Sequence, residues 1–330
     1  MRRCLMALVM SMVIGIPSFG AQPNAADILK RSYDAESRSS LTGRMRTTLY
    51  TGSSKTSAEI AIYRSGSRMK MQYLSGPSAG SSIIDDGRSV TRLDSASKTA
   101  YISGTPDAPD QLGLLLANYA PVVTGTAKIA GRSCYALHIR PRYSGNPSKK
   151  LWVDQSTFVA LKTERLGPDG KITMSTEYTS VDYSKVPPTS LFAVPSGWKI
   201  VRLAESGDSS LDSVRKAVGV TPMKPGYVPK GYRFDGYYVR ENPRAMCFAG
   251  LRYTDGMNTI SIYERRCCGQ GRGMGRGRGP GGGTCNGDCA PCIMAETPQA
   301  QMARVFVGDL TVIVVGDITS SELTKIANSF

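Results

Sequence analysis

Hydrophobic residues near the start of the chain recur with the spacing of an α-helix. Between residues 24 and 38, Ile28, Leu29 and Tyr33 fall on one face of a 3.6-residue period, and most of the residues between them are polar. Asn24 precedes this stretch and is a preferred N-cap residue, because its side chain accepts a hydrogen bond from a free backbone amide of the first turn. These features predict a helix over residues 24–38.

After this helix the hydrophobic positions switch to the two-residue alternation that is typical of β-strands. The apolar positions that share this period are Met45, Leu49, Ile60, Ile62, Met69 and Met71. Short Gly/Ser segments separate the runs, which predicts an antiparallel meander. The six side chains are expected to face inward, where they either line an apolar ligand cavity, to which methionine adapts well, or simply pack beneath the helices. The pattern leaves both readings open.

Further strand patterns continue to residue 183. We expect strands at 134–142, 150–154, 158–166 and 171–183, and a short apolar helix at 110–119. The turn at 167–170, Gly-Pro-Asp-Gly, joins the last two strands. The predicted fold class is α+β, mostly antiparallel β, with one long curling sheet and two helices.

A second, smaller α+β unit follows a polar linker at 204–210. We expect a helix at 211–218, strands at 232–239, 245–253, 258–264, 304–308 and 310–315, and a final helix that Thr319 and Glu322 begin as a capping box. Asp255-Gly256 predicts a tight two-residue hairpin turn, which would set Thr254 opposite Met257. A chain of 330 residues exceeds the usual size of one domain, so we expect domains at 21–203 and 211–330, the second with an insertion at 265–300.

The N-terminus has the three parts of a secretory signal. Arg2 and Arg3 are followed by an apolar run at 5–16 and by small residues before Ala21. The run is too short for a membrane-spanning helix, which needs about 20 apolar residues. Residues 1–20 are therefore expected to be a cleaved signal peptide, and the mature protein to work outside the cytoplasm.

Several short motifs resemble known envelope proteins. Leu-Trp-Val-Asp at 151–154, Leu-Lys-Thr-Glu at 161–164 and Ser-Leu-Phe at 190–192 resemble lipoprotein-carrier-like (LolA/LolB-like) proteins, whose sheet is a half-barrel. Pro-Lys-Gly-Tyr at 229–232 and Val-Gly-Asp-Ile at 315–318, with the closing helix, resemble the C-terminal domain of the MucB/RseB family. The resemblance extends over most of residues 25–330 outside the insertion.

This resemblance implies a non-catalytic periplasmic regulator of an envelope-stress sigma factor. Residues 21–203 would then be the curled half-barrel that senses lipid-like or misfolded material, and the protein would bind a membrane anti-sigma factor. The alternative is a carrier of lipid or lipoprotein that shares the half-barrel and has no signalling role. The resemblance supplies neither catalytic residues nor a cofactor.

The composition argues against an enzyme of the acid–base type. The chain has a single histidine, His138, within an apolar strand pattern. The segment 76–80, Gly-Pro-Ser-Ala-Gly, matches a serine-hydrolase elbow in letters, but it lies between short meander strands instead of between a buried strand and a helix. No acid–base constellation is evident, so we expect a non-enzymatic protein without a cofactor.

The insertion combines basic charge with cysteine. The net charge is +15, and the tract at 272–283 is rich in Gly and Arg. This loop is expected to contact anionic lipid headgroups or an acidic partner; nucleic acid is not expected, because the tract lacks aromatic residues and the protein is exported. The clustered cysteines are Cys267, Cys268, Cys285, Cys289 and Cys292. Export favours disulfides among them, and a four-thiolate metal site is the alternative. Cys134 is expected to be a buried free thiol in its strand.

Overall fold

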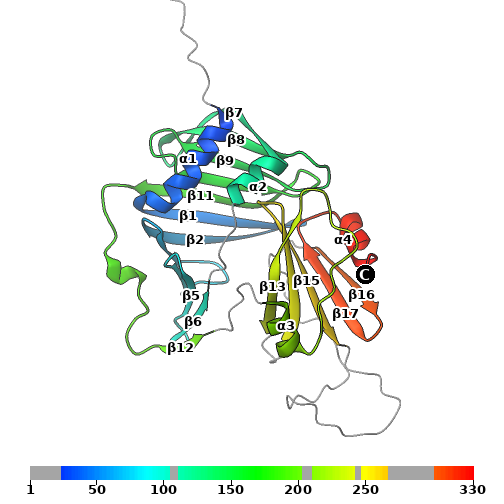
Figure 1. Cartoon of the computed structure of the whole chain (residues 1–330). Helices are drawn as coiled ribbons and strands as arrows, with labels where there is room; N and C mark the ends of the chain where they lie inside the picture. The colour runs from blue at the N-terminus through cyan, green and yellow to red at the C-terminus, as the bar shows by residue number, and fades with distance from the viewer. Residues whose placement is uncertain (1–23, 105–110, 203–209, 242–246, 267–300) are drawn as a thin grey trace, which may run out of the picture.

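Two β-sheets organise the chain (Figure 1). The computed structural model describes residues 24–104, 111–202, 210–241, 247–266 and 301–330. The predicted signal peptide, nearly all of the predicted linker and the five clustered cysteines lie outside these residues. The Gly/Arg tract lies outside them too.

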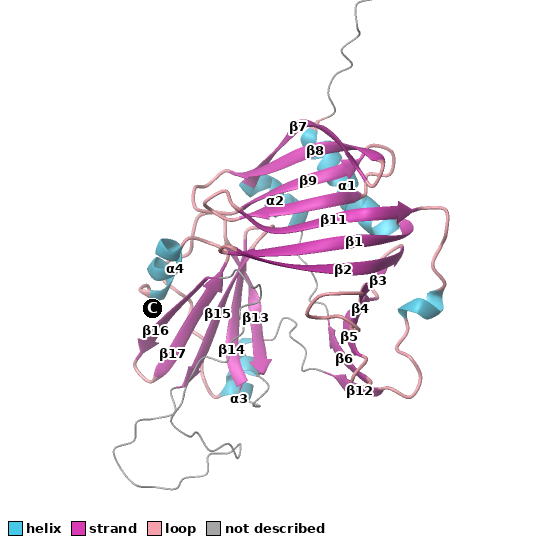
Figure 2. Ribbon diagram, turned by 180° about the vertical axis from the view of Figure 1, so that it is seen from behind, coloured by secondary structure: helices cyan, strands magenta, loops and turns pink. Residues whose placement is uncertain are grey.

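The first sheet has 12 strands in the order β12-β6-β5-β4-β3-β2-β1-β11-β10-β9-β8-β7. The strands are β1 (Ser40–Thr51), β2 (Ser54–Ser65), β3 (Arg68–Tyr73), β4 (Ser82–Asp85), β5 (Ser89–Asp94), β6 (Thr99–Gly104), β7 (Tyr119–Ile129), β8 (Arg132–Pro141), β9 (Ser148–Asp154), β10 (Ala160–Leu166), β11 (Ile172–Asp182) and β12 (Lys199–Arg202). All neighbours pair antiparallel except β12 and β6, which pair parallel. The sheet curls without closing, and we call it the half-barrel (Figure 2).

Two helices cover one face of the half-barrel, which we call the inner face (Figure 1). Helix α1 (Ala25–Arg38) begins at Asn24, whose side chain accepts a hydrogen bond from the Ala26 amide, as the sequence predicts. Its buried residues Ile28 and Leu29 join Leu115 of α2 (Gln111–Asn118) in one apolar cluster. The helices therefore bury the β7–β9 part of the inner face, since residues of these three strands belong to the same cluster.

The opposite face of β4–β6 is covered by the chain that returns from β11 to β12. This segment includes the 3₁₀ helix η1 (Thr189–Phe192). Phe192 packs with Ile84, Leu93 and Ala100, and Tyr63 and Trp198 border the cluster. The return brings β12 alongside β6, so the half-barrel ends at an edge far from β7.

The second sheet has five strands in the order β13-β14-β15-β17-β16. They are β13 (Arg233–Glu241), β14 (Cys247–Thr254), β15 (Thr259–Arg266), β16 (Gln301–Val307) and β17 (Leu310–Gly316), with helices α3 (Leu211–Val218) and α4 (Ser320–Ala327). We call the described residues from 210 onward the C-terminal unit. Leu323 and Ile326 of α4 pack on Ile260 and Ile262 of β15. Thr319 caps α4 by accepting a hydrogen bond from the Glu322 amide, as predicted.

The predicted fold class is confirmed, and two details of the prediction are wrong. Strands β7 and β12 were not predicted. The hairpin turn is longer than the predicted two residues: Thr254 pairs with Thr259, so the loop has four residues, Asp255 to Asn258. The Asp255 side chain accepts hydrogen bonds from the amides of Met257 and Asn258, and this holds the longer loop.

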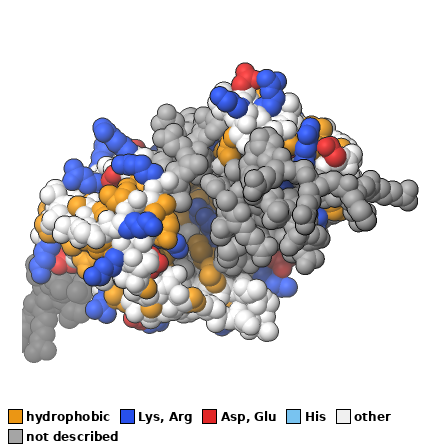
Figure 3. All heavy atoms as spheres, turned by 90° about the horizontal axis from the view of Figure 1, so that it is seen from below, with side chains coloured by type: hydrophobic (Ala, Val, Ile, Leu, Met, Phe, Trp, Pro, Cys, Tyr) orange, Lys and Arg blue, Asp and Glu red, His pale blue; other side chains and the backbone are white. Residues whose placement is uncertain are grey.

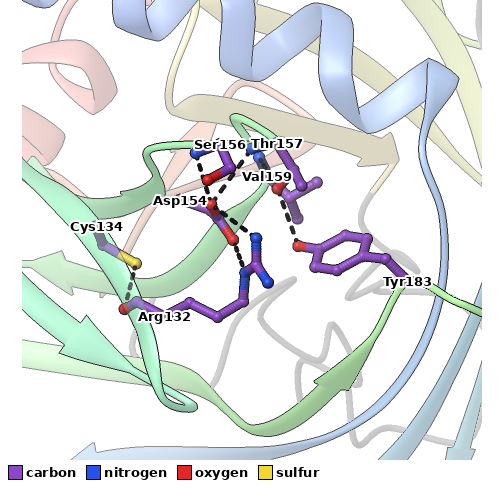
Figure 4. Close-up of polar contacts among 7 residues, drawn as sticks. All are labelled: Arg132, Cys134, Asp154, Ser156, Thr157, Val159 and Tyr183. Carbon is purple, nitrogen blue, oxygen red and sulfur yellow. Dashed lines mark hydrogen bonds and ion pairs between the residues drawn. The ribbon is translucent and has the colours of Figure 1, made fainter.

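A buried polar cluster fastens the β8–β9 end of the half-barrel (Figure 4). Asp154, which is 1% exposed, pairs with Arg132 through two hydrogen bonds. The amides of Ser156 and Thr157 donate to the same carboxylate. Burial alone would raise the pKa of Asp154, but these bonds outweigh it and lower the pKa below its ordinary value. Cys134 lies beside this cluster as a buried free thiol, as predicted.

Candidate functional site

The six residues predicted to line a cavity lie on the inner face. Met45 is opposite Ile60, and Ile62 is opposite Met71. Ile60 and Ile62 are fully buried in a cluster with Leu41, Leu161 and Tyr178, while Met45 and Met71 are partly buried against it. Both isoleucines thus belong to the packed core.

Leu49 and Met69 lie nearer the ends of their strands and are half-buried. The Met69 sulfur accepts a hydrogen bond of 3.2 Å from Arg64, and Arg64 also donates to the carbonyl of Glu36 in α1. Leu49 lies opposite Thr56 and Met174. The inner face therefore has a buried centre of isoleucines and a partly exposed margin of methionine and leucine side chains.

The junction between the half-barrel and the C-terminal unit is polar and buried. Its centre is Asp255, at the tip of the β14–β15 hairpin and fully buried. Tyr119 of β7 donates a hydrogen bond of 2.5 Å from its hydroxyl to the Asp255 carboxylate. Asn258 donates to the Tyr119 hydroxyl at 2.8 Å, and Asn118 donates to the carbonyls of Gly231 and Asp255 at 2.8 and 2.9 Å. These bonds connect residues more than 100 positions apart in the chain.

Gly256 allows the close approach at this junction. Its φ of +93° is in the left-handed region, and a Cβ at this position would lie 2.4 Å from the Leu115 backbone nitrogen. The hairpin tip therefore contacts the backbone of α2 directly. The sequence pattern predicts a turn at this glycine but does not predict its contact with the half-barrel.

Burial and the Asp255 charge both act on the tyrosines of the junction. They raise the pKa of Tyr119 and of Tyr232 well above the ordinary value, so both phenols are protonated at neutral pH. A protonated Tyr119 is the hydrogen-bond donor that Asp255 requires. The hydrogen bond from Tyr119 to Asp255, supported by Asn258, is thus the polar centre of the junction.

A pocket of about 390 Å³ lies beside the junction and is shared by both parts of the molecule. From the half-barrel it is lined by residues of β9, of β10 and of the turn that follows β10, including Lys149 and Arg165. From the C-terminal unit it is lined by the hairpin tip, Gln301 and the start of α4, including Asp317. No local sequence pattern predicts this pocket, because its walls come from segments far apart in the chain.

The surroundings of His138 are those of a strand residue. Its ring nitrogens lie 3.3 Å from the Ser148 hydroxyl and 3.2 Å from Arg140. Burial, with the charges of Arg140 and Lys150, lowers its pKa. Residues 76–80 form an exposed loop between β3 and β4.

The basic charge is spread over the face of the molecule that Figure 3 shows. On the face seen in Figure 3, Lys and Arg side chains lie over both parts of the molecule, with hydrophobic side chains among them. In the described part of the chain, no helix is long and apolar enough to cross a membrane. No group of three or more metal-binding side chains occurs among these same residues.

Comparison with known families identifies the chain. A family model described as the MucB/RseB N-terminal domain matches residues 25–196, more than half of the sequence. The chain belongs to the MucB/RseB family. This confirms the resemblance found in the sequence motifs. A search of curated proteins finds no match.

Solved MucB structures share the fold of nearly the whole chain. The MucA/MucB complex of Pseudomonas aeruginosa aligns with a TM-score of 0.63 and 19% identity, covering 92% of this chain and 96% of that one. MucB in complex with MucA(peri) gives 0.62 and 19%, covering 93% and 98%. A structure of MucB gives 0.57 and 19%, covering 92% and 96%. The similarity extends over both sheets and is a similarity of fold.

Proposed function

We propose that this protein is an exported, non-catalytic regulator of the cell envelope that binds the periplasmic segment of a membrane anti-sigma factor. The main support is the likeness of nearly the whole chain to MucB in structures where MucB is in complex with MucA. Membership of the MucB/RseB family, carried by residues 25–196, agrees with it. Its place of action would be the periplasm, to which the N-terminal signal pattern directs the chain.

The half-barrel would hold an apolar ligand or peptide against the margin of its inner face. Met45, Met69 and Met71 are partly exposed there, and methionine packs against irregular apolar surfaces. Ile60 and Ile62 would support this margin from the core without touching the ligand, because they are buried. Leu49 lies at the same margin.

A direct titration tests the partner. The mature chain from residue 21 is mixed with the purified periplasmic segment of the anti-sigma factor from the same cells, and the complex is measured by calorimetry and size-exclusion chromatography. We expect a stoichiometric complex. Absence of binding, together with transfer of lipid between vesicles by the same preparation, would favour the carrier alternative.

A matched pair of variants tests the inner face. Met71→Lys places a charge on the inner face, and Gln72→Lys places the same charge on the outer face one residue away. We expect lipid co-purification, measured by mass spectrometry, to fall in the first variant and to remain in the second. Circular dichroism of both variants checks that the fold is intact. Equal lipid content in the two would refute the inner-face ligand site.

A further inference from the structure

Two like charges face each other in the half-barrel beside the pocket. Lys149 of β9 and Arg165 of β10 are direct cross-strand partners. Directly opposed like charges destabilise an antiparallel pair. Both side chains are half-buried, and neither forms an ion pair or a side-chain hydrogen bond with the described residues. Two opposed cations of this kind lower the stability of the folded state unless an anion binds between them.

The surrounding charges do not neutralise the pair. Burial and the Arg165 charge lower the pKa of Lys149 to about 8, while Glu36 and Asp255 act weakly in the opposite direction. Asp255 is already engaged by Tyr119 and two backbone amides, and Asp169 pairs with Lys171 at 3.4 Å.

The neighbours of the pair point to the class of ligand. Lys149 lies on the inner face with Leu151, and the cross-strand row runs from Lys149 through Arg165 and Met174 to Leu49. The cationic end of this row is therefore followed by apolar side chains within two strand spacings, about 10 Å. Asp317 on the other wall of the pocket disfavours a doubly charged ligand.

We propose that the pocket between the half-barrel and the C-terminal unit binds a singly charged phosphate ester, held by Lys149 and Arg165. The phosphate ester would be either a soluble phosphodiester or the headgroup of an anionic lipid. The guanidinium of Arg165 suits two oxygens of the phosphate, and Lys149 adds a point charge. Because the walls come from both parts of the molecule, the occupant would contact the half-barrel and the C-terminal unit at once. This site goes beyond the regulator role, since its chemistry does not depend on which protein docks.

Binding is tested with glycerophosphoglycerol, the headgroup of phosphatidylglycerol without acyl chains, by calorimetry on the mature chain. We expect saturable binding that weakens about tenfold or more in Lys149→Met and Arg165→Met, the loss typical of one charged hydrogen bond. The matched control is Lys150→Met, which removes the same charge from the other face of β9 and should bind like the wild type. Binding that is unchanged in Lys149→Met and Arg165→Met would overturn the site.

Vesicles distinguish the two sources of the phosphate ester. Flotation with phosphatidylglycerol vesicles, against phosphatidylcholine vesicles as control, shows whether the lipid headgroup reaches the pocket. Binding of both glycerophosphoglycerol and the anionic vesicles, each sensitive to Lys149→Met, supports a lipid source. Binding of the soluble compound alone supports a soluble source. Binding of neither overturns the proposal.

Stability without ligand separates a binding pair from a structural one. In phosphate-free buffer, Lys149→Met and Arg165→Met should melt at the same temperature as the wild type or higher, because each removes a repulsion. A lower melting temperature in both would show that the pair supports the fold, and would overturn the proposal. Titration of these variants with the anti-sigma segment should be unchanged, so failure of this site and failure of the regulator function give different results.

Discussion

One carboxylate buried in the half-barrel and one buried in the sheet of the C-terminal unit are held in opposite ways. Asp154 in the half-barrel has Arg132 beside it, and its pKa is lowered. Glu264 in the C-terminal unit is fully buried, and both its oxygens accept from the Met223 amide at 3.0 and 3.1 Å. Burial raises the pKa of Glu264 to about 7.

The difference shows what an adjacent cation does for a buried acid. With Arg132, Asp154 stays ionised over the physiological pH range and fixes one end of the half-barrel. Glu264 gains a proton near neutral pH and so makes the C-terminal unit sensitive to pH. Asp255 is also buried, and its carboxylate accepts hydrogen bonds from a hydroxyl, a side-chain amide and backbone amides.

Removing the Arg132 cation beside Asp154 should have the largest effect on the free energy of unfolding. Arg132→Met leaves Asp154 buried without its partner, and we expect a loss of about 3–5 kcal/mol in the free energy of unfolding. Urea denaturation of the full chain measures it. The control is Arg46→Met, whose ion pair with Glu59 is exposed and should cost less than about 1 kcal/mol. Equal losses of stability in Arg132→Met and Arg46→Met would contradict the contrast between the buried and the exposed ion pair.

Removing the second carboxylate should stabilise the protein at high pH. The folded state keeps the Glu264 proton that the unfolded chain releases between the ordinary value, 4.5, and about 7. Stability should therefore fall as pH rises through this window. Glu264→Gln removes the penalty, so we expect a gain of about 3 kcal/mol at pH 8 and little difference at pH 4.5. Denaturation at both pH values measures it, and an unchanged pH profile would show that Glu264 titrates normally.

The junction can be broken sterically without altering any charge. Gly256→Ala places a methyl group against the Leu115 backbone, whereas Gly170→Ala has a similar positive φ with no atom within 4 Å. Both variants carry the backbone penalty. The overpacking should cost Gly256→Ala about 2 kcal/mol more than its control. Urea denaturation measures both, and equal costs would mean that the hairpin tip does not pack tightly on α2.

Removing a single hydrogen bond of the junction should have the smallest effect on stability. Tyr119→Phe removes the donor to Asp255, and we expect a loss of about 1.5 kcal/mol, as for a hydrogen bond to a charged group. Tyr183→Phe removes a bond from the neutral Thr157 hydroxyl and should cost less. Thermal denaturation compares the two variants. A larger loss of stability in Tyr183→Phe than in Tyr119→Phe would show that the junction bond is not the stronger of the two.

Local signals in the sequence were enough to predict the helices and most strands. Asn24 and the Thr319–Glu322 capping box place α1 and α4 to within one residue, because each cap is made by residues adjacent in the chain. Strand β7 was missed because Pro121 and Gly125 interrupt its alternation. Proline is tolerated there because β7 is an edge strand, and a register shift occurs between Val123 and Gly125.

The junction and the pocket could not be predicted from local patterns. Asp255 and Tyr119 are 136 residues apart, and each also fits a local role, one as a turn residue and the other at the end of a helix. The Lys149–Arg165 pair appears only when the register of β9 and β10 is known, because a shift of one residue would turn one side chain to the other face.

The path of the chain places the junction far from the point where the chain leaves the half-barrel. The chain leaves the half-barrel at β12, one edge of the 12-stranded sheet, while the Asp255 hairpin contacts α2 and β7 at the opposite edge. The C-terminal unit is thus joined to the half-barrel covalently after one edge of the sheet and by non-covalent contacts at the other edge. A force that opened the contact would leave both halves attached, and closure would be a first-order reaction whose rate is independent of protein concentration. Because both halves stay attached, a modest set of hydrogen bonds is enough to hold the hairpin tip against α2.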